Sequence, residues 1–171
     1  MAMTYFELFD IPVQLKVNTV SLSKKFFELS RKYHPDYFAT GNEKAQAEAL
    51  EKSALLNKAW KTFQTPDATI KYVLREKGLL EEEEKYELPP DFLMEVLEIN
   101  EQLMETDEMA NTAKLSSVVS QLSYEIYEPV KEIVENYQED IISEKELLQV
   151  KEYYYKKKYL DRIIRQLSTG K

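Results

Sequence analysis

Residues 19–36 read TVSLSKKFFELSRKYHPD, and this stretch decides the fold. At 100° per residue, one face of a helix collects the apolar side chains: Leu22, Phe26, Leu29 and Tyr33. The opposite face collects the basic side chains, diluted only by Glu28: Lys24, Lys25, Arg31 and Lys32. Asn18 is a good N-cap, and the helix must end before Pro35, because a residue that precedes proline avoids helical angles. The stretch therefore predicts an amphipathic helix over 19–33 with one basic face.

The tripeptide His34-Pro35-Asp36 follows this helix directly and precedes a second long helical pattern over 43–63. Its simplest structural interpretation is a turn, in which Pro35 breaks the helix and Asp36 caps the turn. A basic helix face that leads into such a turn, with a partner helix behind it, is less common by accident than either feature alone. The combination favours a docking surface, and the plain turn remains the alternative.

Two shorter helices complete the N-terminal region. Residues 4–7, TYFE, fit a capping box that opens a helix over 5–9. Thr65-Pro66 restarts a helix that runs to about Lys77, where Gly78 stops it. The first 78 residues therefore predict an antiparallel pair of long helices with two short ones.

The C-terminal region predicts three longer helices, over 91–105, 107–139 and 144–167. Pro129 lies inside the second of them and should kink or split it. Short connections between the three indicate an antiparallel three-helix bundle. The segment 79–90 contains a solvated acidic run and Pro89-Pro90, which is typical of a connecting loop. The sequence therefore predicts an all-α chain with modules at 1–78 and 91–171, joined by a linker over 79–90.

The composition excludes several function classes. The chain has 171 residues and a net charge of −8, which argues against nucleic acid or an anionic membrane as partner. There is no cysteine for a thiolate metal site or nucleophile, and there is one histidine. Three distant glycines cannot form a phosphate-binding loop, and no apolar run approaches a membrane span. We therefore expect a cytoplasmic protein that is not an enzyme, without metal, cofactor or signal peptide.

The charge is divided unevenly between the two modules. Residues 1–78 carry 12 basic and 9 acidic side chains, whereas residues 79–171 carry 11 basic and 22 acidic ones. The net charges are thus +3 and −11. Such an asymmetry indicates that the two modules have different partners.

Residues 4–78 resemble a J-domain. His34-Pro35-Asp36 is similar to the signature tripeptide of that family, Tyr5-Phe6-Glu7-Leu8-Phe9 to its first helix, and Leu56-Asn57-Lys58-Ala59-Trp60 to its third. The resemblance implies stimulation of ATP hydrolysis by a DnaK/HscA-class chaperone. It also implies the chaperone-binding residues: His34, Pro35, Asp36, Lys24, Lys25, Arg31 and Lys32. Tyr37 stands where the family usually has lysine, and Glu28 interrupts the basic face.

The helix expected over 91–105 has an unusually wide apolar surface. A core stripe is formed by Phe92, Val96, Ile99 and Leu103. About 80° further round the helix lies a second apolar strip, formed by Leu93, Leu97 and Met104. Next to this strip lie one further apolar residue and three acidic ones: Met94, Glu98, Glu101 and Glu105. This surface is either a broad core face or an exposed apolar–acidic patch of the kind that binds a partner. The pattern leaves both interpretations open.

Residues 92–98, FLMEVLE, resemble the start of the C-terminal domain of the iron–sulfur co-chaperone family HscB. The length and the N-terminal J-domain are also similar to that family. The resemblance implies binding of an IscU-like iron–sulfur scaffold protein through the C-terminal bundle. The implied scaffold-binding residues are Leu93, Met94, Leu97, Glu98, Glu101, Glu105 and Tyr159.

Three other functions place different demands on the sequence. A J-domain co-chaperone with a different client would share the signature tripeptide. A helical di-metal carboxylate enzyme would need Glu-x-x-His pairs in the bundle, which the single His34 cannot supply. A non-enzymatic helical adaptor would need a degenerate tripeptide, whereas this tripeptide is intact.

Overall fold

The computed structural model describes residues 3–105 and 109–169, without the side chains of residues 103, 109–112 and 167–169. The described residues are all-helical, as the sequence predicts, and contain no strand. The elements are α1 (Tyr5–Phe9), α2 (Thr19–Lys32), η1 (Pro35–Phe38), α3 (Glu43–Phe63), α4 (Pro66–Glu76), α5 (Pro90–Glu105), α6 (Met109–Tyr127), η2 (Glu128–Val130), α7 (Lys131–Glu135) and α8 (Glu144–Thr169). They form two compact units, Met1–Val73 with Tyr137–Asp140, and Leu74–Asn136 with Ile141–Lys171.

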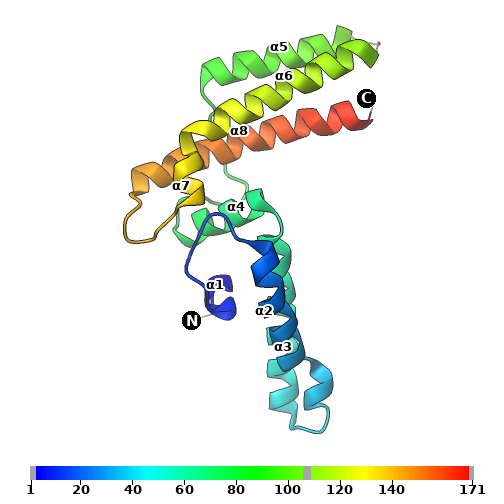
Figure 1. The fold of residues 1–171 in the computed structure, drawn as a ribbon, viewed down its shortest axis with the longest axis vertical. Coiled ribbons are helices and arrows are strands. Elements are labelled where there is room, and N and C mark those ends of the chain that lie inside the picture. Colours follow the sequence, from blue (N-terminus) through cyan, green and yellow to red (C-terminus); the bar gives the residue numbers. More distant parts are fainter. Residues whose placement is uncertain (1–2, 106–108, 170–171) are drawn as a thin grey trace. The chain divides into compact units, whose positions relative to one another are not determined.

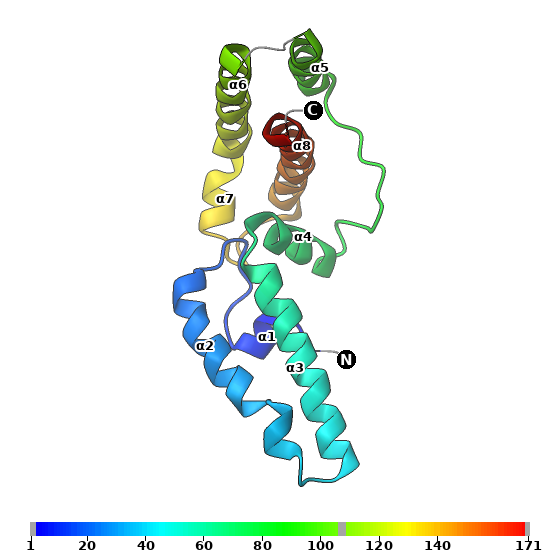
Figure 2. The same cartoon turned by 90° about the vertical axis from the view of Figure 1, so that its right-hand side faces the viewer.

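The first unit is built on α2 and α3, which run antiparallel side by side (Figures 1 and 2). The core is aromatic: the rings of Phe6 and Phe9 lie 5.1 and 5.6 Å from that of Phe63 on α3. Tyr5 stacks on Tyr72 of α4 at 4.2 Å, and its backbone N–H donates to the Tyr72 hydroxyl at 2.9 Å. These contacts hold α1 against α3 and α4.

The helix starts of this unit follow the local sequence. Thr4 and Glu7 form the capping box, each side chain accepting from the backbone N–H of the other. The Asn18 side chain caps α2 by accepting from two early amides. The end of α1 is set by Asp10, which adopts a left-handed conformation with φ of 53°.

The second unit is a three-helix bundle of α5, α6 and α8. Figure 1 shows α5 and α8 running in the same direction, with α6 antiparallel to both. Pro129 splits the expected second helix into α6, the 3-10 turn η2 and α7, which confirms the predicted break. Helix α5 begins at Pro90, one residue before the expected start. The expected start of the next helix at Asp107 lies outside the described residues.

The segment before α5 is held against α8 within the second unit. The Lys151 ammonium lies 2.8 Å from a carboxylate oxygen of Glu84, and the ring of Tyr86 stacks on that of Tyr155 at 4.5 Å. The expectation of a solvated acidic run is therefore wrong at Glu84, whose half-buried side chain pairs with a cation of α8. The hydrogen bond from Lys151 lowers the pKa of the Glu84 carboxyl. Burial, and then the Glu84 charge, raises the pKa of Tyr155 to about 12.

Candidate functional site

The first candidate surface is the turn after α2, called here the His34 turn and comprising residues 34–37. His34 caps the 3-10 helix η1: its Nδ1 accepts from the backbone N–H of Asp36 at 3.3 Å. The same nitrogen lies 3.6 Å from Oδ2 of Asp36. Both side chains point into solvent, with 51% and 90% of their surface exposed. The turn therefore presents an imidazole and a carboxylate side by side in a fixed relation.

The cap is provided by a different residue from the one expected. The sequence suggested that Asp36 caps the turn, but His34 does so, because its side chain precedes the first free amides of η1. Tyr37 follows with its ring edge-on to the imidazole at 6.5 Å and is 70% exposed. The His34 turn thus adds an exposed aromatic ring next to the histidine.

The turn rests on a rigid support formed by α2 and α3. Phe26 of α2 stacks on Trp60 of α3 at 4.8 Å, almost in parallel. The Tyr33 ring, just before the turn, lies beneath the ammonium of Lys52 at 5.0 Å. These contacts restrict the end of α2 and so restrict the direction in which the turn projects.

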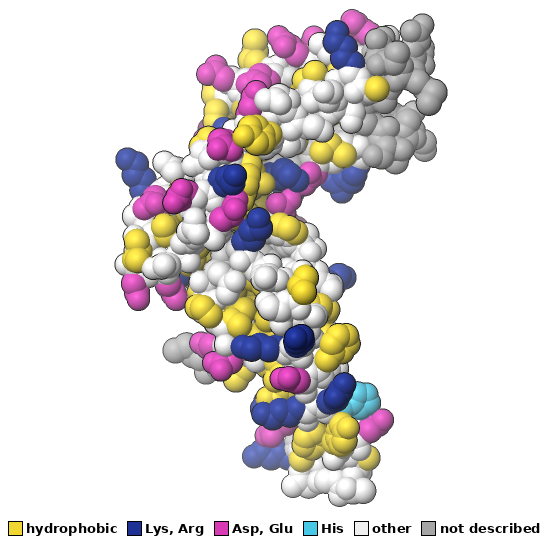
Figure 3. All heavy atoms as spheres, in the orientation of Figure 1, with side chains coloured by type: hydrophobic (Ala, Val, Ile, Leu, Met, Phe, Trp, Pro, Cys, Tyr) yellow, Lys and Arg dark blue, Asp and Glu magenta, His cyan; other side chains and the backbone are white. Residues whose placement is uncertain are grey.

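The four basic side chains of α2 are not equivalent. The Lys25 ammonium donates to the carbonyl oxygens of Phe9 and Asp10 at 3.0 and 3.1 Å, where it stabilises the C-terminal end of α1. Lys32 folds over the Tyr33 ring at 5.4 Å. Lys24 and Arg31 are exposed, and neither forms an ion pair with any described residue. Figure 3 shows Lys and Arg side chains close to the histidine of this unit.

The sequence analysis did not predict that two apolar side chains lie on the exposed basic face of α2. Val20 and Phe27 are 80% and 59% exposed, and they alternate with Lys24 and Arg31 at the spacing of one helix face. The adjacent Phe26-Phe27 pair carried the signal, because neighbouring residues on a helix cannot both face the core. The exposed face of α2 is therefore mixed apolar and basic.

The second candidate surface lies on α5. Leu93, Met94 and Leu97 are exposed by 41%, 62% and 53%, whereas Phe92, Val96 and Ile99 are buried. Of the two interpretations of the wide apolar pattern, the structure therefore supports the exposed patch. The side chain of Leu103, expected in the core stripe, lies outside the described residues.

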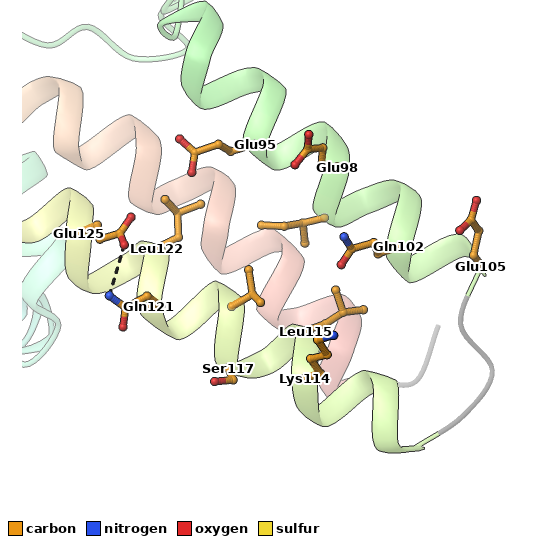
Figure 4. A pocket seen from close by; sticks show the side chains of 12 residues that line it. Glu95, Glu98, Gln102, Glu105, Lys114, Leu115, Ser117, Gln121, Leu122 and Glu125 are labelled. Carbon is orange, nitrogen blue, oxygen red and sulfur yellow. Dashed lines mark hydrogen bonds between the residues drawn. The ribbon is translucent and has the colours of Figure 1, made fainter.

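The carboxylates expected beside this patch continue it around the helix. Glu98, Glu101 and Glu105 are all exposed. Glu98 and Glu105 also line a groove between α5 and α6 (Figure 4), so they lie on the side of α5 that faces α6. The predicted scaffold-binding residues of α5 are thus spread around the solvent-exposed side of the helix and do not form one flat face.

Tyr159 belongs to the neighbouring helix α8. Its ring is 39% exposed and lies under the guanidinium of Arg162 at 5.4 Å. Lys156, one turn earlier, reaches the Phe92 ring at 5.6 Å. Because α5 and α8 run in the same direction, Tyr159 lies about one turn further along α5 than Phe92. The predicted scaffold-binding residues are called here the α5 surface: Leu93, Met94, Leu97, Glu98, Glu101, Glu105 and Tyr159.

No group of acidic or histidine side chains among the described residues is arranged to hold a metal ion. No helix in the described ranges has both the length and the apolar character needed to cross a membrane.

Comparisons with known proteins agree on one family. Residues 88–168 match the family model described as "HSCB C-terminal oligomerisation domain". The crystal structure of human co-chaperone protein HscB is similar over 99% of this chain and 82% of that one, with a TM-score of 0.81 and 27% identity. Chaperone HscB from Vibrio cholerae is similar over 98% of this chain and 97% of that one, with a TM-score of 0.75 and 25% identity. Residues 88–168 thus carry the C-terminal domain of the HscB family, and nearly the whole chain has the fold of HscB co-chaperones.

Proposed function

We propose that this protein links an iron–sulfur scaffold protein to an ATP-hydrolysing chaperone and promotes the transfer of the cluster. Its first unit stimulates the ATPase of a DnaK/HscA-class chaperone, and its second unit binds an IscU-like scaffold. The observation that carries the proposal is the exposed, capped His34 turn at the end of a basic helix.

The chaperone surface consists of His34, Pro35 and Asp36 together with the basic side chains of α2. His34 acts by shifting a conformational equilibrium of the ATPase, not as an acid or base, because the nucleotide is bound and hydrolysed by the chaperone. Lys24 and Arg31 are the cations that remain open to a partner, and they would steer an acidic chaperone surface toward the turn. Lys25 and Lys32 contribute less directly, since each ammonium already has an intramolecular contact.

The scaffold surface is the α5 surface. Exposed Leu93, Met94 and Leu97 supply apolar area that no other described part of the chain covers. Glu98, Glu101 and Glu105 supply negative charge beside it, and Tyr159 supplies an amphipathic ring from α8. An apolar centre edged by charge is the usual composition of a protein–protein hot spot and its rim.

The two surfaces work together because they are on one chain. A scaffold held on the second unit is kept at a high effective concentration near a chaperone engaged by the first. The stimulation of ATP hydrolysis is then coupled to the presence of the client.

Single-turnover ATP hydrolysis by the DnaK/HscA-class chaperones of the same cell tests the proposal. It is measured with and without this protein, with and without the scaffold, and with His34→Gln. We expect stimulation that requires the scaffold for its full extent and that His34→Gln removes. Stimulation that ignores the scaffold would assign the protein to another client, and an absence of stimulation for every chaperone would reject the co-chaperone activity.

A further inference from the structure

A groove of about 770 Å³ runs between α5 and α6 (Figure 4). Its floor is apolar and is formed by one residue of α5 and three of α6: Ile99, Leu115, Val118 and Leu122. Val118 is 42% exposed in it, which is unusual for an aliphatic side chain between two packed helices. Ile99, Leu115 and Leu122 are buried in the core of the bundle, so Val118 supplies the apolar contact area that the floor leaves exposed.

The walls of the groove are acidic along most of their length. Glu95, Glu98 and Glu105 line it from α5, and Glu125 lines it from α6. Among the described residues, none of the three α5 carboxylates has a cationic partner, and Glu125 accepts only from the Gln121 amide at 3.3 Å. Among the described residues that line the groove, Lys114 is the single cation.

The charge also changes from one end to the other. Because α5 and α6 are antiparallel, Glu95 and Glu125 lie at the same end of the groove, and both walls are acidic there (Figure 4). At the opposite end α5 carries Glu105 and α6 carries Lys114, so one wall is negative and the other positive. A bound segment would therefore gather its cations at the end marked by Glu95 and Glu125.

The length of the groove fits a short helix. Residues 95–105 of α5 span about 15 Å at 1.5 Å per residue, which corresponds to about ten residues of a bound helix. A helix that lies in such a groove uses apolar anchors at i, i+3/i+4 and i+7. The acidic walls require lysine or arginine beside those anchors.

We infer that the groove binds a basic amphipathic helical segment of the client protein, in addition to the client's contact with the α5 surface. This inference rests on the proposed function, because it assigns the segment to the scaffold. The client then contacts α5 from two sides, through Leu93 and Leu97 on the side of α8 and through the groove on the side of α6. A second copy of this chain is a poor occupant, since the net charge of −8 makes two copies repel each other.

Binding of the IscU-like scaffold to the full chain, measured by calorimetry at two salt concentrations, tests this inference. Glu95→Gln with Glu125→Gln should weaken binding about fivefold at low salt, and the loss should shrink at about 0.5 M salt. Val118→Asn should weaken it about tenfold at both salt concentrations, because it removes apolar contact rather than charge. Asparagine and valine have similar helix propensities, so α6 stays intact.

Two controls test whether the effect arises in the groove and whether the bound segment is basic. Glu87→Gln with Glu132→Gln makes the same change in net charge at exposed positions outside the groove, and binding should change less than twofold. Lys114→Gln removes the cation that lines the groove, so it should leave binding unchanged or tighten it. A loss of binding with Lys114→Gln as large as that of the glutamate pair would mean that the groove takes an acidic segment, which overturns the inference.

The remaining outcomes separate this inference from the proposed function. If the groove variants bind the scaffold like wild type while Leu93→Ala/Met94→Ala/Leu97→Ala does not, the groove is not part of the site and the proposed function stands. If wild type fails to bind the scaffold, the proposed client is rejected, and the inference is rejected with it. If light scattering shows that wild type self-associates and the groove variants do not, the occupant is a second copy and the inference is overturned.

Discussion

The His34 turn and the α5 surface are built in opposite ways. The His34 turn is polar, held by its own hydrogen bond and by the stacked Phe26 and Trp60, and it is flanked by cations. The α5 surface lies on a regular helix, whose outward side is apolar and acidic, and includes Tyr159 of the neighbouring α8. One surface depends on the exact shape of a short turn, whereas the other depends on the composition of a helix face.

Under the proposed function, this difference lets each of the two surfaces select its own partner. A partner attracted by the cations of α2 is repelled by the carboxylates of α5, and the reverse also holds. The net charges of +3 over residues 1–78 and −11 over 79–171 follow the same division. The comparison therefore predicts that each surface can be disabled while the other keeps its function.

The largest effect is expected at the His34 turn. His34→Gln removes the imidazole that caps η1 and faces solvent, and stimulation of the chaperone ATPase should fall about 30-fold or more, the loss typical of a hot-spot residue. Affinity for the scaffold, measured by calorimetry, should stay within twofold of wild type. A parallel loss of scaffold binding would show that the two surfaces are not separable.

The second effect concerns the apolar part of the α5 surface. Leu93→Ala/Met94→Ala/Leu97→Ala should weaken scaffold binding about 30-fold and leave the helical circular dichroism and the melting temperature almost unchanged, because these side chains are exposed. Val96→Ala is the matched control on the buried side of the same helix. It should cost about 2 kcal/mol of folding stability. If the triple variant unfolds instead, those three residues belong to the core.

The third effect distinguishes the cations of α2 from one another. Lys24→Gln with Arg31→Gln should slow association with the chaperone severalfold at low salt, and the difference should vanish at high salt. Stopped-flow fluorescence measures this rate. Lys25→Met should instead lower the melting temperature by a few degrees, because about 1 kcal/mol is lost with its bonds to the carbonyls of α1. Equal kinetic effects from all three lysine and arginine positions would contradict the assignment.

The smallest effect concerns the contact between Glu84 and Lys151, which lies in neither surface. The folded state lowers the pKa of Glu84 from its usual 4.5, so the ion pair stabilises the fold above that pH and this stability is lost as the pH falls below it. Glu84→Gln should therefore cost up to about 1 kcal/mol at pH 7 and almost nothing at pH 3. Urea unfolding at the two pH values measures it, and an equal cost at both would show that charge is not the cause.

The sequence predicted most of the fold because its signals are local. The bounds of α1 and α3 follow from Thr4 and from the pattern of 43–63, and Pro129 marks the break between α6 and α7. Each depends on a few neighbouring residues, through a cap, a period or a missing N–H. The surface position of Leu93, Met94 and Leu97 could not be decided in this way, because it depends on how far α6 and α8 wrap around α5.

The details of the sites depend on tertiary contacts, which is why the sequence missed them. Lys25 looks like any other cation of α2 until the carbonyl oxygens of Phe9 and Asp10 are placed beside it. Glu84 looks like part of a solvated run until Lys151, 67 residues away, is seen beneath it. The exposed ring of Phe27 did have a local signal, since Phe26 already occupies the buried face.

The most direct test of the central claim is whether both surfaces must be on one chain. His34→Gln and the Leu93→Ala/Met94→Ala/Leu97→Ala variant are mixed with chaperone and scaffold, at a concentration where light scattering shows monomers, and single-turnover ATP hydrolysis is measured. Each variant keeps one intact surface, and the account predicts that the mixture lacks the scaffold-dependent stimulation that wild type gives. Recovery of wild-type stimulation by the mixture would contradict it, because the two surfaces would then act without being joined.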